Sequence, residues 1–198
     1  MIALVTGGAA SGKSAYAESL AKALPGPHAY VATMRHGDAE TEARIARHRE
    51  MRAGKGFVTV ELAPAIDLSD LGGGEGAMLK QSCYVEQPTG LFESCGTARG
   101  TFTPTEIYAE CQTALLEDLG NLVANGLQEK MEDVLAFDNV VIVANEVGCD
   151  GIQYDPFTMD YIETLGALAC QLGARADVVV EVVAGIPNVV KGEVPEGC

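Results

Sequence analysis

Short apolar runs alternate with helix-favouring stretches along most of this chain. The run NVVIVA at 139–144 is almost continuously apolar, which is typical of a parallel strand that helices cover on both faces. The alanine-rich stretch 13–24 favours a helix that ends at the Pro-Gly pair following it. Because strands alternate with helices, the pattern predicts an α/β fold with a mostly parallel central sheet flanked by helices. The predicted strands are 2–5, 28–33, 56–62, 139–144 and 177–183, and the predicted helices are 13–24, 38–52 and 161–172.

The middle of the chain carries much weaker periodicity. Residues 72–104 begin with GGGEG and contain three more glycines and two prolines. Because Gly and Pro interrupt helices and strands, we expect an inserted, partly irregular segment here. A length of 198 residues suits one domain, so we expect a single domain over 1–198 that includes this insertion. From 105 to 135, periodicity alone would allow one long helix.

A glycine-rich turn follows the first predicted strand. The residues GGAASGKS at 7–14 fit the pattern G-x-x-x-x-G-K-[ST], in which backbone N–H groups surround phosphate oxygens. The lysine of this pattern reaches the β- and γ-phosphates, the serine hydroxyl can ligate Mg²⁺, and the N-terminus of the next helix attracts the anion. Because the motif follows an apolar strand and opens a helix, we predict a nucleotide-binding phosphate loop rather than an ordinary tight turn. Its members are Gly7, Gly8, Ala9, Ala10, Ser11, Gly12, Lys13 and Ser14.

A phosphate loop of this kind needs an acidic residue at the end of a neighbouring strand to help hold Mg²⁺. The pair Glu117-Asp118 follows the apolar triplet ALL and is one candidate. Glu146, which follows the strand predicted at 139–144, is another. If 105–135 were one helix, Glu117 would instead be a solvated surface charge.

Basic residues gather between positions 35 and 55, which hold 6 of the 13 lysines and arginines. On a helix, Arg44, His48 and Arg52 are spaced i, i+4, i+8 and share one face. A cationic face with a central imidazole suits a polyphosphate, and the neutral imidazole nitrogen is a nucleophile that can attack phosphorus. A solvated face paired with nearby glutamates would produce the same pattern, so the residues alone leave both interpretations open.

The overall charge argues against two classes of partner. With 13 Lys+Arg against 28 Asp+Glu, the formal net charge is −15. Such a chain is repelled by nucleic acid and by anionic membrane surfaces unless its bases are concentrated in one place. The concentration here is only local and small, because 35–55 holds six basic and four acidic residues, a net charge of +2, while the rest holds 7 and 24, so we expect no nucleic acid or membrane partner. We therefore predict a local polyphosphate site that depends on Mg²⁺ for further positive charge.

Two further features bear on location and cysteine chemistry. No apolar run reaches the roughly 20 residues that span a bilayer, and the N-terminus lacks the basic region of a secretory signal. We therefore expect a cytoplasmic protein without a membrane span. The six cysteines form no CxxC pair, which favours free thiols. A metal or redox role for Cys83, Cys95 and Cys111 is the weaker alternative.

Several motifs together resemble one known family. Their order and spacing resemble the adenosylcobinamide kinase/adenosylcobinamide-phosphate guanylyltransferase family over both ends of the chain, and the similarity fails mainly over 72–112. Beyond GGAASGKS, the motifs are YVAT at 30–33, R-I-x-x-H-x-x-x-R at 44–52, F-x-T-x-E at 57–61, LLE at 115–117, Asn125, NEVG at 145–148, Ala176-Asp177, GIP at 185–187 and Lys191.

This resemblance implies a two-step reaction in cobalamin assembly. First, a nucleoside triphosphate, ATP or GTP, phosphorylates the aminopropanol hydroxyl of adenosylcobinamide. Then GTP guanylylates a histidine that matches His48, and GMP passes to the cobinamide phosphate to give adenosylcobinamide-GDP. Family members have a RecA-like P-loop NTPase fold and assemble as trimers, so we expect a homotrimer.

The resemblance also implies the site residues. Lys13 and His48 are the implied catalytic residues, and Ser14 and Glu117 are the implied Mg²⁺ ligands. The alignment makes 114–116 a short buried strand with Glu117 at its C-terminal end, beside the phosphate loop. Besides the loop, the implied nucleotide contacts are Ala32, Thr33, Met34, Arg49, Glu50, Met51, Arg52, Glu61 and Glu117.

Three positions depart from the family pattern. The family often has arginine at the position of Ala10, usually has arginine at that of Met159 or Ile162, and often has asparagine at that of Ala169. These differences remove polar groups from regions near the phosphates or the corrinoid. Two alternatives therefore stay open: a P-loop small-molecule kinase without guanylyl transfer, and a nucleotide-binding protein without catalysis.

Overall fold

The computed structural model of the chain describes residues 1–33, 43, 46, 55–61, 83–86, 101–102, 111–148 and 150–195. Its strands are β1 (Ile2–Gly7), β2 (His28–Ala32), β3 (Phe57–Glu61), β4 (Cys83–Glu86), β5 (Thr101–Phe102), β6 (Thr113–Leu116), β7 (Asn139–Asn145), β8 (Val178–Val183) and β9 (Ile186–Lys191). Its helices are α1 (Lys13–Ala23), α4 (Leu119–Ala124), the 3-10 turn η2 (Gln128–Lys130), α5 (Met131–Val134) and α6 (Pro156–Arg175).

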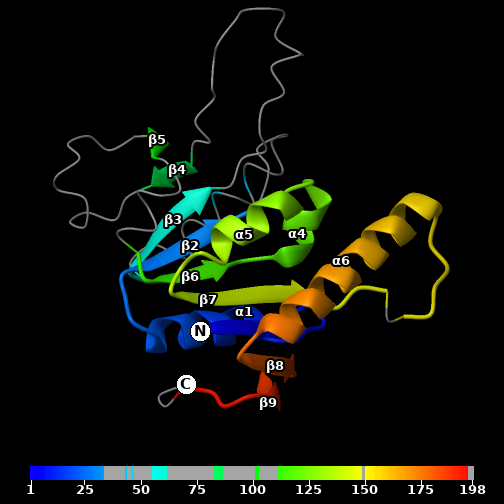
Figure 1. Ribbon diagram of the computed structural model, residues 1–198. Helices are drawn as coiled ribbons and strands as arrows, with labels where there is room; N and C mark the ends of the chain where they lie inside the picture. Colours follow the sequence, from blue (N-terminus) through cyan, green and yellow to red (C-terminus); the bar gives the residue numbers. More distant parts are fainter. Residues whose placement is uncertain are drawn as a thin grey trace, which may run out of the picture.

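Within these ranges the nine strands form one sheet in the order β5-β4-β3-β2-β6-β7-β1-β8-β9 (Figure 1). The six neighbours from β3 to β8 run parallel, whereas β4, β5 and β9 are antiparallel and lie at the two edges. The predicted α/β fold with a mostly parallel sheet is therefore confirmed. β1 lies between β7 and β8, so the loop that follows β1 emerges from the interior of the sheet.

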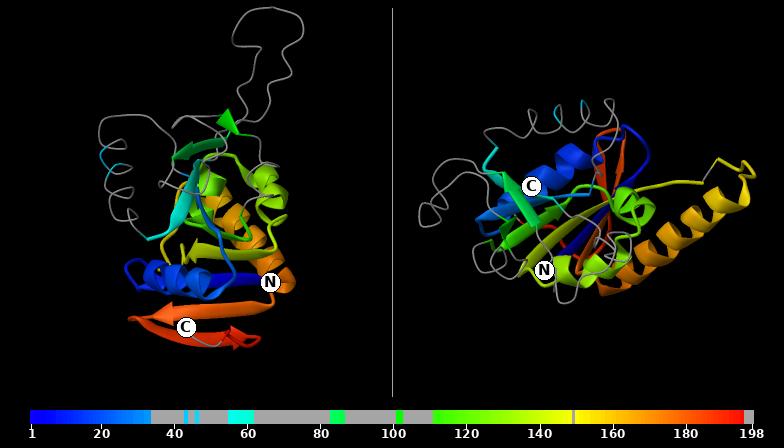
Figure 2. Two further views of the ribbon diagram at one scale, coloured as in Figure 1. Left: turned by 90° about the vertical axis from the view of Figure 1, so that its left-hand side faces the viewer. Right: turned by 90° about the horizontal axis from the view of Figure 1, so that it is seen from above.

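Helices cover both faces of the sheet, with α1 on one face and α4, α5 and α6 on the other (Figure 2). This arrangement explains the apolar run of β7. Val141 and Val143 pack in the cluster that contains Leu20 of α1, whereas Val140 and Ile142 pack on the opposite side with the α4 helix. Because successive side chains of a strand point to opposite faces, a strand covered on both sides must be apolar at nearly every position.

The long helix that periodicity allows over 105–135 is wrong for the described residues 111–135. Thr113–Leu116 is instead a fully buried strand that pairs with both β2 and β7. The chain then starts a new helix at Leu119, because the Asp118 carboxylate accepts hydrogen bonds from the Gly120 and Asn121 amides. Tertiary pairing thus overrides local helix propensity, and the short strand expected from the family alignment is confirmed.

Several other boundaries differ from expectation. Helix α6 starts five residues earlier than predicted because Asp155 caps it and Pro156 suits its first turn.

Strand β9 is not predicted by the pattern; it pairs with β8 across a turn in which Ala184 and Gly185 both have positive φ. Strands β4 and β5 lie inside the segment expected to be irregular, and they extend the sheet. Of the helix predicted at 38–52, Ala43 and Ala46 are helical and the rest lies outside the described residues.

Among the described helices, none is long and apolar enough to cross a membrane.

Candidate phosphate-binding site

The predicted phosphate loop connects the end of β1 to the start of α1. Gly7 is the last residue of β1, and a Cβ atom there would lie 2.5 Å from the Val182 carbonyl oxygen, so a side chain is sterically excluded. Further along, Ala10 and Gly12 adopt φ of 56° and 92°. These left-handed positions curl the backbone sharply, as a loop that surrounds an anion requires.

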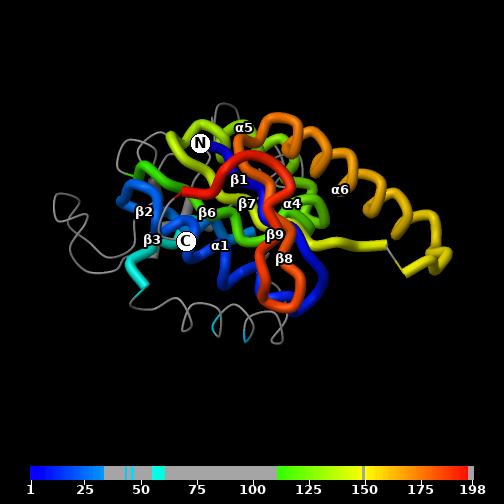
Figure 3. The backbone as a smooth tube through the Cα atoms, turned by 90° about the horizontal axis from the view of Figure 1, so that it is seen from below, coloured from blue at the N-terminus to red at the C-terminus, as the bar shows by residue number. Residues whose placement is uncertain are grey.

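The turn between β8 and β9 supports this loop from the side. The Gly185 amide donates to the Ser11 carbonyl oxygen at 2.7 Å, and a Cβ atom on Gly12 would lie 3.2 Å from the Gly185 Cα. Figure 3 shows the tip of this hairpin against the loop between β1 and α1. The GIP motif at 185–187, which contributes to the family resemblance, therefore includes the residue that holds the phosphate loop in shape.

Lys13, the lysine of the predicted motif, is the first residue of α1. Its side chain is only 6% exposed, and Nζ donates to the Gly8 carbonyl oxygen at 3.0 Å. Helix α1 begins at the same residue, and its first turn contains no acidic side chain. Ser14 follows with an exposed side chain, and the buried Ser11 Oγ has no hydrogen-bond partner within the described part of the chain. A positive helix terminus, an ammonium group and hydroxyls thus converge on the loop.

Two carboxylates follow β6, and Asp118 is held firmly. Its Oδ1 accepts from the first turn of α4, and its Oδ2 accepts from Asn145 Nδ2 at 3.1 Å. Burial is the largest influence and raises the pKa of Asp118, the negative charge of Glu117 adds to that rise, and the α4 amides and Lys13 oppose it. Asp118 therefore caps α4 and joins β6 to the end of β7, while Glu117 remains our candidate for holding a metal.

Glu146, the other acidic candidate, lies next to the loop. Its amide donates to the Gly7 carbonyl oxygen at 3.2 Å, and its exposed carboxylate accepts from Thr6 Oγ1 at 3.4 Å. The two acidic candidates from the sequence therefore follow β6 and β7. In the sheet, β7 is next to β1 and β6 is next to β7.

The end of β2 joins the same edge of the sheet. Thr33 is buried, its hydroxyl donates to the Asp118 carbonyl oxygen at 3.2 Å, and its own carbonyl oxygen accepts from Asn125 Nδ2 at 2.7 Å. Ala32 is the last residue of β2 and pairs in register with Glu61, the last of β3. In parallel α/β sheets, ligands bind outside the carboxyl ends of the strands.

The structure therefore brings the predicted loop and the predicted residues at the strand ends together. It does not describe the predicted residues of the basic segment. The loop, Ala32, Thr33 and Glu117 lie at the carboxyl edge, as does the backbone of Glu61. Sequence reasoning did not identify Asn145 as the link to Asp118, although the NEVG motif contained it. Outside the described residues lie Met34, His48, Arg49, Glu50, Met51, Arg52 and the side chain of Glu61.

The structure places all the residues that depart from the family pattern. Ala10 is exposed on the phosphate loop. Met159, Ile162 and Ala169 lie on α6 and are half-buried, and a Cβ atom on Gly148 would lie 3.0 Å from Ile162 Cγ2. An isoleucine thus packs beside the glycine of NEVG, at one of the two positions aligned with the family's arginine.

The described cysteines include a buried one, Cys111, and an exposed one, Cys170, and neither is in a disulfide bond. Among the described residues, no group of three or more His, Cys, Asp or Glu side chains is placed to hold a metal ion. Cys95 and the side chain of Cys83 lie outside the described part.

Comparison with known proteins gives one consistent family. The protein-family model CobU, described as cobinamide kinase / cobinamide phosphate guanyltransferase, matches residues 3–79 and 100–190. The chain is 31% identical over 191 residues to the bifunctional adenosylcobalamin biosynthesis protein CobP of Pseudomonas aeruginosa, covering 96% of this chain and 97% of that protein. It is also 31% identical to the bifunctional CobU proteins of Salmonella typhimurium and Escherichia coli, in each case covering 94% of this chain and 97% of the relative.

Proposed function

The chain belongs to the cobinamide kinase / cobinamide phosphate guanyltransferase family, and on this premise we propose that it catalyses both reactions on adenosylcobinamide. The main support for the proposal is the loop at 7–14, in which the buried Lys13 bonds to the Gly8 carbonyl oxygen. This loop occurs in a chain that matches a bifunctional relative over nearly its full length.

In the kinase step, ATP or GTP binds with its β- and γ-phosphates in the loop at 7–14. Lys13 moves from the Gly8 carbonyl oxygen to the phosphate oxygens, and the N-terminus of α1 faces the same anion. The aminopropanol hydroxyl of adenosylcobinamide attacks the γ-phosphorus and passes its proton to water, while the bond from that phosphorus to the bridging oxygen breaks and releases the nucleoside diphosphate. The protein's part in such a transfer is mainly positioning and charge stabilisation.

In the guanylyl step, the His48 imidazole attacks the α-phosphorus of GTP. A P–N bond forms, the α–β P–O bond breaks, and pyrophosphate leaves. The phosphate of the cobinamide phosphate then attacks the same phosphorus, the P–N bond breaks, and adenosylcobinamide-GDP is released. The covalent histidine splits one displacement into two. Further nucleotide contacts in this proposal are Ala32, Thr33, Met34, Arg49, Glu50, Met51, Arg52, Glu61 and Glu117.

Mg²⁺ fits the donors at this edge of the sheet. The Ser14 hydroxyl is exposed on the first turn of α1, and Glu117 follows β6, so a hydroxyl and a carboxylate oxygen are offered to a hard cation. When bound, the ion would neutralise charge on the triphosphate and its leaving group. Within this proposal Ser14 and Glu117 hold the ion while Lys13 holds the phosphates.

We expect GTP binding to depend strongly on Mg²⁺, because the chain as a whole carries a net charge of −15 and its basic 35–55 segment carries only +2. In excess chelator, GTP affinity measured by equilibrium dialysis should fall by about tenfold or more. The Mg²⁺ concentration needed for half-maximal binding should rise in Ser14→Ala and stay unchanged in Ser19→Ala, a serine of the same helix whose hydroxyl bonds to the Ala15 carbonyl oxygen. Tight GTP binding without divalent cation would contradict the metal assignment.

We further propose a homotrimer in the cytoplasm. The β8–β9 hairpin exposes four large apolar side chains, and apolar side chains of this kind are often covered at protein interfaces. These side chains are Val183, Ile186, Val189 and Val190.

The proposed function is tested by incubating the unmodified chain with GTP and adenosylcobinamide. GTP labelled on its γ-phosphate should transfer label to adenosylcobinamide. GTP labelled on its α-phosphate should leave label on the protein in an acid-labile, alkali-stable bond. Phosphoryl transfer without protein-bound label would favour the kinase that lost guanylyl transfer, and GTP binding with neither reaction would favour the non-catalytic alternative.

A further inference from the structure

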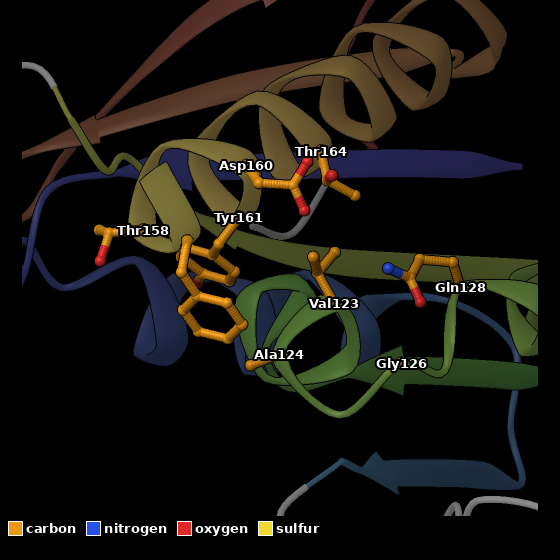
Figure 4. Close-up of a pocket in the computed structure, with 9 residues that line it drawn as sticks. Val123, Ala124, Gly126, Gln128, Thr158, Asp160, Tyr161 and Thr164 are labelled. Atoms are coloured by element: carbon orange, nitrogen blue, oxygen red, sulfur yellow. The ribbon is translucent and has the colours of Figure 1, made fainter. Parts of the chain in front are cut away.

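A second concave site lies between α4 and α6, outside the phosphate loop (Figure 4). Its volume is about 380 Å³. Two aromatic residues one helical turn apart on α6, Phe157 and Tyr161, contribute apolar surface, and α4 contributes Val123 and Ala124. The remaining lining residues are Gly126, Gln128, Thr158, Asp160 and Thr164. A mainly apolar cavity with a few hydroxyl, amide and carboxylate groups has the composition of a small-molecule site.

The exposure of the Phe157 side chain suggests a role in ligand binding rather than in packing the hydrophobic core. The side chain is 85% exposed although it stands on the first turn of a 20-residue helix. It therefore contributes little to the core. A large aromatic ring left in water beside a cavity offers a flat surface on which a flat ligand can stack.

Helix α4, whose N-terminal end Asp118 caps, lies between the phosphate site and the cavity that its last residues line. In Figure 4, Tyr161 extends from α6 toward α4. Its hydroxyl lies 2.7 Å from where a Cβ atom on Gly120 would stand, in the helical turn that Asp118 caps. Burial, and secondarily the negative charge of Asp118, raise the pKa of Tyr161, and the charge of Lys13 acts in turn on Asp118. At about 1.5 Å per residue, Val123 lies roughly 7 Å along the helix from Asp118.

The charge of the cavity separates it from a nucleotide site. Among the described residues that line it, none is basic and one, Asp160, is acidic. A triphosphate would be repelled there, whereas a cation with a broad apolar face would be attracted. Adenosylcobinamide has this character, because its trivalent cobalt outweighs the single negative charges of the corrin ring and the adenosyl carbon. Amide side chains surround its flat macrocycle and can bond to hydroxyls and to a glutamine side chain.

We propose that the α4–α6 cavity binds one edge of the corrinoid macrocycle, with Phe157 stacking on the ring and Thr158 and Thr164 meeting its amides. This assignment rests on the proposed function, since it names where the acceptor substrate of that function binds. A volume of about 380 Å³ holds an edge of the macrocycle and leaves the rest outside, against the exposed Phe157. The hydroxyl-bearing arm then extends along α4 toward the phosphate site.

The proposal is tested by equilibrium dialysis of the full chain with adenosylcobinamide, followed by its visible absorbance. Phe157→Ala should weaken corrinoid binding about tenfold, because it removes the stacking surface. Ala124→Trp should fill the cavity and abolish binding. Ile152→Ala is the matched control, since Ile152 is 60% exposed and does not line the cavity. All three variants should bind GTP and take up α-label as the unmodified chain does.

The outcomes separate this proposal from the proposed function. Equal adenosylcobinamide affinity in Phe157→Ala, Ala124→Trp and the unmodified chain overturns the cavity assignment and leaves the function intact. A smaller oligomer in these two variants, with unchanged corrinoid affinity, assigns the cavity to a second copy of this chain and also overturns the proposal. An unmodified chain that neither binds nor phosphorylates adenosylcobinamide overturns both.

Discussion

Replacing Lys13 by methionine should lower kcat for both the phosphorylation of adenosylcobinamide and the guanylylation of the protein by about 10²–10³-fold. Methionine keeps most of the buried volume and removes the ammonium group that the loop holds beside Gly8. In our proposal that group stabilises negative charge on the triphosphate in the transition states of both steps. The two activities should therefore fall together, which initial-rate measurements with γ-labelled and α-labelled GTP will show.

Lys22→Met is the matched control for this substitution. Lys22 lies on the last turn of the same helix, where its ammonium group stands 5.7 Å from the centre of the Phe57 ring. Both substitutions change the net charge equally, so a general electrostatic effect would appear in both variants. Thermal unfolding shows whether either variant has lost its fold. A folded Lys13→Met enzyme with activity within about threefold of the unmodified chain would show that the loop does not act as we propose.

Replacing His48 by alanine should abolish covalent labelling from α-labelled GTP while adenosylcobinamide is still phosphorylated. Only the guanylyl step needs a nucleophile on the protein, because the kinase step passes the γ-phosphoryl group directly to the hydroxyl. We expect label at background level and a kinase rate within about tenfold of the unmodified chain, since in our proposal the imidazole also belongs to a basic segment that binds the nucleotide.

His36→Ala is the control, because it removes another histidine of the same basic segment. It should retain the label, and the label should be lost in acid and kept in alkali, as a P–N bond requires. Equal labelling of His48→Ala and the unmodified chain would falsify the assignment of His48. Joint loss of labelling and phosphorylation, with GTP binding retained, would mean that His48 serves the kinase step as well.

The phosphate loop was the most predictable part of the site, because its properties depend on adjacent residues. The motif GGAASGKS itself shows a glycine at the position with no room for a side chain, a lysine at the helix start and a serine after it. The apolar strand before it and the helix after it were also predicted correctly. Local backbone geometry and the helix dipole act within a few residues, so a short motif contains most of the information.

Residues 105–135 show where local patterns fail. Helix propensity and periodicity allow a continuous helix. Thr113–Leu116 is instead a strand, because hydrogen bonding to β2 on one side and β7 on the other stabilises it more than a helix would. The family alignment supplied this strand, whereas periodicity could not, because its stabilising partners on β2 and β7 are distant in the sequence. The same reason explains why β9 and the contact of Gly185 with Ser11 were not predicted.

The sequence by itself determined the α/β class, the strand and helix on either side of the predicted phosphate loop, and the family, because each depends on residue types in a fixed order along the chain. Only the tertiary structure decided that Asp118 caps α4 and bonds to Asn145, that the β8–β9 turn supports the loop, and that α4 and α6 enclose an apolar cavity. These contacts join residues far apart in sequence. They follow from strand register and helix packing, which the whole set of buried side chains determines together.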